Sequence, residues 1–309
     1  MIMKRVFSCL IFSFVLLTSA SAQQDAMYTQ YVFDKIVINP AFAGSTDWAT
    51  GTMRHRSQFV GLPGAPLTQT LTGEFPFLIR NMGVGLKIIN DKIGVTRQTS
   101  LEGIYAYHLK LESGKLSFGL ETGMINQAID FSNLIKTDAQ DNALPLGKQS
   151  TIVYDASVGV CYQAKKFFAG LSSFHLTRSK LSFKDAANSI STSHLFNHNF
   201  LIVGGLFNLN PDFTLEPSLL LKHVLGAPLQ ADVNISSTYL KKLTLGLSYR
   251  TGDAMAFILK VNATEGLRIG YSYDLTLSKL GAYSHGAHEI LLSYGIELYA
   301  RDSNPLPRY

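Results

Sequence analysis

The sequence predicts an all-β protein, a transmembrane barrel of the outer-membrane type with about 14 antiparallel strands and an N-terminal segment that is periplasmic or plugs the barrel. Three observations support this prediction: an export signal, side chains that alternate with a period of two, and connections that alternate between short and long. The composition agrees, because 46% of the 309 residues are apolar and only 16% are charged. Abundant Gly, Tyr and Phe suit strands and turns.

The first 22 residues have the pattern of a cleaved export signal. Lys4 and Arg5 form a positive start, residues 6–17 supply an apolar run of twelve, and Ala20 to Ala22 supply the small residues that signal peptidase requires. A membrane anchor is the weaker alternative, because twelve residues are too few to cross ~30 Å of hydrocarbon as a helix. We therefore expect a mature chain that starts at Gln23 and is located in the cell outer membrane.

Alternation with a period of two runs through most of the mature chain. A soluble β-sandwich also alternates, but Tyr and Phe near the segment ends and a polar face rich in Gly and Ser favour a membrane barrel. The expected strands, an even number as in single-chain bacterial barrels, are residues 49–59, 66–74, 82–90, 95–111, 115–127, 151–163, 166–175, 196–207, 211–223, 228–239, 242–251, 254–262, 266–275 and 288–299.

The lengths of the connections predict the orientation of the barrel. The three longest stretches, 128–150, 176–195 and 276–287, all fall on one end of the expected barrel. The connections after the fourth, sixth, eighth, tenth and twelfth segments are two or three residues long and fall on the other end. Because outer-membrane barrels have long external loops and short periplasmic turns, we expect the long stretches to face outward and both termini to be periplasmic.

The chain accordingly divides into four parts. We expect a signal peptide at 1–22, an N-terminal periplasmic or plug segment at 23–48, the β-barrel at 49–300 and a C-terminal tail at 301–309. The formal net charge of +5 is scattered along the chain, which argues against nucleic-acid binding.

No motif predicts catalysis, a cofactor or a metal. His285, His288 and Glu289 superficially resemble a metal site, but their order differs from the zincin motifs, and we expect a structural corner there. His194 and His198 are four residues apart in or beside an expected outer loop, which predicts solvated side chains. A Ser–His pair on the outer wall, as in barrel lipid hydrolases, stays an open alternative. We therefore predict a protein that is not an enzyme, with no catalytic, cofactor or metal residues.

The most specific string in the chain is residues 24–45, which reads Q-D-A-M-Y-T-Q-Y-V-F-D-K-I-V-I-N-P-A-F-A-G-S. Its turn-forming residues and large aromatic side chains predict an ordered segment. Two roles are equally open, docking of a partner and packing against the barrel's own wall. The candidate docking residues are Tyr28, Gln30, Tyr31, Phe33, Asn39, Pro40, Phe42 and Gly44.

This string closely resembles the opening of the PorP/SprF family of outer-membrane proteins of Bacteroidetes, which typically reads Q-D-P-x-F-T-Q-Y-x-F-N-x-x-x-I-N-P-A-Y-A-G-S. Further similar stretches are Arg54 to Pro66, Tyr273 to Leu275 and Gly286 to Ile290. The departures are mild: Ala26 stands in place of Pro, Asp34 in place of Asn and Ala287 in place of Ser.

The resemblance implies a component of the type IX secretion system, which exports proteins bearing a C-terminal sorting domain. Such a component belongs to the core machinery or serves one cargo, including adhesins of gliding motility. The implied partners are outer-membrane lipid, the periplasmic ring proteins of the system, an OmpA-like peptidoglycan-binding protein and the secreted cargo or adhesin. The alternative is a passive outer-membrane porin or hydrophobic-solute transporter, which predicts an open lumen.

Overall fold

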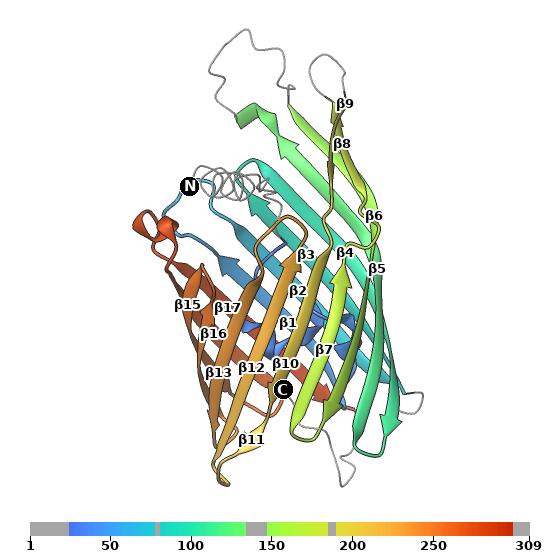
Figure 1. Ribbon diagram of the computed structural model, residues 1–309, viewed down its shortest axis with the longest axis vertical. Coiled ribbons are helices and arrows are strands. Elements are labelled where there is room, and N and C mark those ends of the chain that lie inside the picture. Colours follow the sequence, from blue (N-terminus) through green and yellow to red (C-terminus); the bar gives the residue numbers. More distant parts are fainter. Residues whose placement is uncertain (1–24, 78–80, 134–146, 185–189, 299–309) are drawn as a thin grey trace, which may run out of the picture.

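A computed structural model describes residues 25–77, 81–133, 147–184 and 190–298. Their main sheet curls into a closed barrel of fourteen antiparallel strands, because β10 pairs with β7 on one side and with β12 on the other (Figure 1). The predicted fold class and strand number are therefore confirmed. The expected signal peptide (1–22) and tail (301–309) lie outside the described residues.

The strands of the barrel are β1 (Trp48–Ser57), β2 (Leu67–Phe77), β3 (Met82–Ile93), β4 (Thr96–Leu111), β5 (Gly114–Asp130), β6 (Lys148–Ala164), β7 (Phe167–Phe174), β10 (His198–Gly205), β12 (Phe213–Val224), β13 (Gln230–Tyr239), β14 (Leu243–Arg250), β15 (Ala254–Asn262), β16 (Leu267–Thr276) and β17 (Ala287–Glu297). The two-residue β11 (Phe207–Asn208) extends the edge of β12. Short 3-10 helices are η1 (Gln30–Phe33), η2 (Lys35–Val37), η3 (Pro40–Phe42), η5 (Phe131–Asn133) and η6 (Lys279–Ala282).

The two ends of the barrel differ in their connections. The β5–β6, β7–β10 and β16–β17 connections meet at one end, which we call the long-loop rim, and tight turns such as β4–β5 and β6–β7 meet at the other, the short-turn rim (Figure 1). The connection expected as a loop at 176–195 contains a hairpin of β8 (Lys180–Lys184) and β9 (Ile190–His194). Leu181 and Leu195 pack there against Ile125 of β5, and this small apolar cluster supports the hairpin.

The outward face of the wall carries an apolar belt with a polar border toward the long-loop rim. On β4, for example, Leu101, Tyr105 and Leu109 point outward and are exposed. Toward the long-loop rim a row of outward polar residues crosses five neighbouring strands in register: His55, Gln69, Asn90, Thr99 and Asn126. An apolar belt below such a row is the surface that a barrel presents to lipid. Among the described residues, none of the helices is long and apolar enough to span a membrane.

The protein's core lies inside the barrel. The N-terminal residues 25–45, which we call the arm, run through the lumen, where the short blue helices are visible in Figure 1. Tyr31, Ile36 and Phe42 of the arm pack against wall residues that include Phe168 and Ile202. The arm therefore occupies the space that the apolar interior fills in a soluble protein.

Candidate functional site

The arm threads the lumen from the long-loop rim to the short-turn rim. At its start Asp25 contacts His175, which directly follows β7 at the long-loop rim. Further along, the Asn39 amide donates to the carbonyl of Val160 at 3.1 Å. Near its end the Gly44 N–H donates to Glu74 at 2.9 Å, close to the short-turn rim. The first described residues of the arm therefore lie near the long-loop rim and its last residues near the short-turn rim.

Glycines in the wall allow the arm to approach the strands at backbone distance. A methyl group on Gly119 of β5 would overlap the Ala41 nitrogen and the Pro40 carbonyl carbon. Other wall glycines whose Cβ would overlap the arm are Gly83, Gly159 and Gly270, which face Ala43, Asn39 and Gln30 respectively. The Gly-rich polar face of the strands thus serves close packing of the arm.

A buried ionic cluster fixes the first half of the arm to β1, β16 and β17. The Glu289 carboxylate accepts from the backbone N–H groups of Thr29 and Gln30 at 2.9 and 3.0 Å. It also pairs with Arg54 at 3.2 Å and with Arg56 at 3.1 Å. These side chains are nearly inaccessible to solvent, and buried charges are tolerated only when they are paired in this way.

Two further groups of buried charges flank this cluster. Arg56 also pairs with Asp274 at 2.7 Å, and Arg250 pairs with Asp232 at 3.0 Å. On β3, β4 and β5, Lys87 pairs with Glu102 and Glu121 at 2.8 and 2.9 Å. None of these ion pairs was predicted from the sequence. Their signal was present, because each charge occupies an inward position of an alternating strand.

Seven of the eight candidate docking residues are buried in the lumen, and Phe33 is partly buried. Tyr28 donates to or accepts from Thr70 at 2.9 Å, and the Gln30 amide donates to the Glu289 carbonyl at 3.0 Å. The structure brings the eight together along one path and places them against the barrel's own wall. Contact of these residues with a partner protein stays a prediction.

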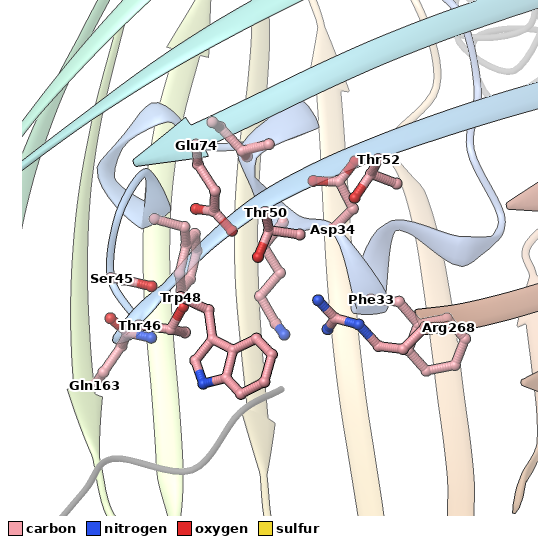
Figure 2. A pocket seen from close by; sticks show the side chains of 13 residues that line it. Phe33, Asp34, Ser45, Thr46, Trp48, Thr50, Thr52, Glu74, Gln163 and Arg268 are labelled. Atoms are coloured by element: carbon pink, nitrogen blue, oxygen red, sulfur yellow. The ribbon is translucent and has the colours of Figure 1, made fainter. Parts of the chain in front are cut away.

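A pocket of about 60 Å³ lies beside the arm at the short-turn rim (Figure 2). Phe33 and Arg268 line one side of it, and Trp48 and Glu74 line the other. Lys35 also reaches this pocket, and its Nζ donates to the Val32 carbonyl at 2.8 Å. Burial lowers the pKa of Lys35 to about 7, so that this ammonium readily loses its charge near neutral pH. Through this pocket the arm is reachable from the short-turn end.

The histidines that drew attention in the sequence fall on different faces. His288 points outward, where its Nδ1 meets the Tyr271 hydroxyl at 2.7 Å, whereas Glu289 points into the lumen. His194 is exposed on β9, but His198 is buried in the lumen, where its Nδ1 lies 3.1 Å from Asp25. The expectation of a solvated His198 is wrong, because β10 begins at this residue and its alternation turns the ring inward. No group of three metal-binding side chains is formed within the described residues.

One Ser–His contact lies on the outer wall. The Ser57 hydroxyl is 3.4 Å from His55 Nε2 on the outward face of β1, where His55 is exposed and Ser57 is half-buried. Among the described residues, His55 has no hydrogen bond to an acidic or amide side chain, so the pair does not form a triad.

Comparison with solved structures shows the same fold. The chain has a TM-score of 0.53 with the CymD monoaromatic hydrocarbon channel, at 11% identity, over 87% of this chain and 94% of that one. The toluene transporter TodX of P. putida gives a TM-score of 0.50 at 10% identity, over 85% and 94% of the two chains. A Pseudomonas aeruginosa FadL homologue gives 0.50 at 11% identity, over 84% and 93%.

No curated protein matches the sequence. The family profile of the type IX secretion system membrane protein PorP/SprF, however, matches residues 20–294, which include the arm and nearly the whole barrel. The resemblance carried by residues 24–45 is therefore confirmed. This chain belongs to the PorP/SprF family of type IX secretion system membrane proteins and has the fold of an outer-membrane barrel.

Proposed function

We propose that this protein is a non-enzymatic outer-membrane component of the type IX secretion system that supports export of proteins with a C-terminal sorting domain. Membership in the PorP/SprF family supports this role. The observation that carries the proposal is the arm, which runs through the lumen and is held there by buried side chains and paired charges. A barrel closed in this way acts as an anchored platform for other proteins.

Docking of periplasmic partners is proposed at the short-turn rim. Phe33 and Ser45 of the arm, together with Thr46 and Asp47 directly after it, keep partial exposure near this rim. Periplasmic ring proteins or an OmpA-like peptidoglycan-binding protein would meet the arm there. A photo-crosslinking residue at Thr46 should capture such a partner in cells, and the same residue at Met27, near the other rim, should not. Equal capture at both positions would contradict docking at this rim.

Cargo contact is proposed at the long-loop rim, which would face the cell exterior. The β8–β9 hairpin extends this rim and is separate from the barrel sheet. Deletion of the gene, followed by profiling of secreted and surface proteins, tests the role. Loss of all products with a sorting domain would indicate a core component. Loss of one adhesin, with or without a gliding defect, would indicate a cargo-specific component. Unchanged secretion would refute the proposal.

The second candidate is a passive porin or hydrophobic-solute transporter. The fold shared with CymD and TodX, which are named as a channel and a transporter, is the observation that favours it. Conductance of the purified protein in planar bilayers separates the two functions. We expect negligible conductance from the mature chain and stable pores after deletion of residues 25–45. Stable pores from the intact mature chain would favour the transporter.

Export through a cleaved signal peptide belongs to the same proposal. Mass spectrometry of the protein isolated from membranes should give a chain that begins at Gln23.

A further inference from the structure

A second cavity lies in the lumen near the long-loop rim, on the other side of the arm from the pocket in Figure 2. Its volume is about 90 Å³, enough for roughly six to nine water molecules at ~10–15 Å³ each. Tyr28, Tyr31 and Val37 of the arm line one side, and side chains of β3, β4, β7, β10, β12, β13 and β14 line the rest. The secretion role proposed above does not use this cavity.

Two polar pairs line the cavity on widely separated strands. Asp91 of β3 is the cross-strand neighbour of Gln98 on β4, and Lys222 of β12 is the neighbour of Gln230 on β13. Asp91 accepts a hydrogen bond from Thr68 at 2.5 Å. Among the described residues, the side chains of Gln98 and Gln230 have no hydrogen bond. Lys222 has no hydrogen bond or ion pair, and its Nζ lies over the Phe200 ring, 5.9 Å from the centroid. These groups therefore offer several donors and acceptors to a ligand.

Ser100 adds a hydroxyl group to the same wall. It is 3% exposed, it lines the cavity, and its Oγ has no hydrogen-bond partner. A buried polar group without a partner costs free energy, which a ligand that supplies the hydrogen bond recovers.

The ionisable side chains that line the cavity are equal in number for the two signs. Burial alone would lower the pKa of His175, but Asp25 and Asp155 raise it to about 11, so this ring is charged at neutral pH. The four basic lining residues are Lys87, His175, Lys222 and Arg250. The four acidic lining residues are Asp25, Asp91, Glu102 and Asp232. A ligand with a net charge would upset this balance, and a neutral polar ligand would not.

Two aromatic rings complete the lining. Phe174 and Phe200 lie edge to face, with centroids 5.6 Å apart and planes at 89°. Apolar surface beside a few open polar groups is the usual make-up of a small-molecule site. A hydroxyl group both donates and accepts hydrogen bonds, so hydroxyl groups can satisfy the glutamine amides as well as Asp91, Lys222 and Ser100. The C–H surface of a sugar ring can pack on the aromatic rings. We propose that this cavity binds a small neutral polyol or monosaccharide.

The experiment uses the full mature protein in a detergent whose headgroup contains no sugar. Binding of glycerol, D-xylose and D-glucose is measured by saturation-transfer NMR and by calorimetry. We expect one of these polyols to bind and the double variant Gln98→Leu/Gln230→Leu to weaken that binding by about tenfold. The controls are Gln69→Leu, on the outward face, and Gln163→Leu, at the other pocket. Both should leave polyol binding unchanged. The migration of unheated samples in gels verifies the fold of each variant.

Gln98→Glu provides a second test that keeps the size and polarity of the side chain, and it should weaken polyol binding because it adds an unbalanced charge. The proposal is overturned if none of the three polyols binds, or if their binding is the same in the double variant. It is also overturned if glycine or acetate binds at this site and the polyols do not. These outcomes are independent of secretion, so the platform role can stand when the cavity proposal fails.

Discussion

Glu289 joins the arm to the barrel through one buried carboxylate. It accepts from two arm N–H groups and pairs with two arginines of β1. Replacing it in Glu289→Gln leaves Arg54 and Arg56 with less compensating charge, and breaking a buried pair costs about 3–5 kcal/mol. We expect the free energy of unfolding in urea, measured in detergent, to fall by that order. Glu265→Gln, in an exposed turn between β15 and β16, is the control and should change it little.

The contact between Asp25 and His175 makes the attachment of the arm to the barrel, and therefore the stability of the protein, dependent on pH. Their Oδ1 and Nε2 atoms are 2.9 Å apart, and the other ring nitrogen of His175 is 2.7 Å from Asp155. Burial alone would raise the pKa of Asp25, but His175 and His198 lower it well below its usual range. The pKa of His175 is raised from 6.5 to about 11.

The direction of the pH effect follows from these shifts. Because the pKa of His175 is raised in the folded protein, its protonated ring contributes its full stabilisation below pH 6.5. This stabilisation is lost as the pH rises from 6.5 toward 11. Because the pKa of Asp25 is lowered in the folded protein, its carboxylate stabilises the folded protein above pH 3.8. This stabilisation is lost as the pH falls below 3.8. The contact should therefore be strongest between about pH 4 and 6.5.

The variant His175→Asn tests this pH dependence. Asn tolerates the positive φ of 57° at this position, so the backbone is not strained. The difference in melting temperature between the wild type and the variant should be largest between about pH 4 and 6.5 and should shrink as the pH rises to about 10. His194→Gln, on the exposed β9, should follow the wild type at each pH. A difference that grows with pH would contradict the assignment.

At the scale of the element, η3 is held against β5 and β6 by its fit to the wall. Gly119 leaves room for Pro40 and Ala41, and the Cys161 thiol lies 3.6 Å from the Ala41 carbonyl. Cys161 is 1% exposed and is the only cysteine downstream of the expected signal cleavage. Its thiol therefore reports whether η3 is in place.

Gly119→Ala should displace η3 and expose this thiol. We expect maleimide labelling of Cys161 to be slow in the wild type and to accelerate by about tenfold in the variant, which corresponds to a local change of ~1.4 kcal/mol. Gly51→Ala is the matched control, because a Cβ at Gly51 meets no atom within 4 Å. Equal labelling in all three proteins, with the barrel folded, would show that η3 tolerates the added methyl group.

At the scale of the whole molecule, the apolar outer belt determines how the barrel sits in lipid. Leu120 and Asn126 both point outward from β5, the first within the belt and the second in the polar row near the long-loop rim. Arginine costs about 2–4 kcal/mol at the bilayer midplane and about 0–1 near its surface. Leu120→Arg should therefore make folding into vesicles less favourable by that larger amount, and Asn126→Arg should change the free energy of folding little. Equal effects would contradict a lipid-facing belt.

The number of strands, their order and the closed barrel could be predicted from the sequence, because these depend on local signals. An amphipathic strand repeats every two residues, and a tight turn separates it from the next. The expected segment 95–111, for example, corresponds to β4 at 96–111. The β8–β9 hairpin could not be predicted in this way, because it depends on Leu181 and Leu195 meeting Ile125 of β5, more than fifty residues earlier in the sequence.

The sequence by itself determined that this chain forms an outer-membrane barrel of the PorP/SprF family, since alternation and the string at 24–45 are both visible along the chain. Only the tertiary structure decided that residues 25–45 of this string lie inside the barrel, with Asp25 near the long-loop rim, and that paired charges hold them there. Arg56 and Asp274, which hold Thr29 between them, are 218 positions apart. Inward positions of a strand are polar whether they face water or a buried partner, so the pattern along the chain does not distinguish an empty lumen from a filled one.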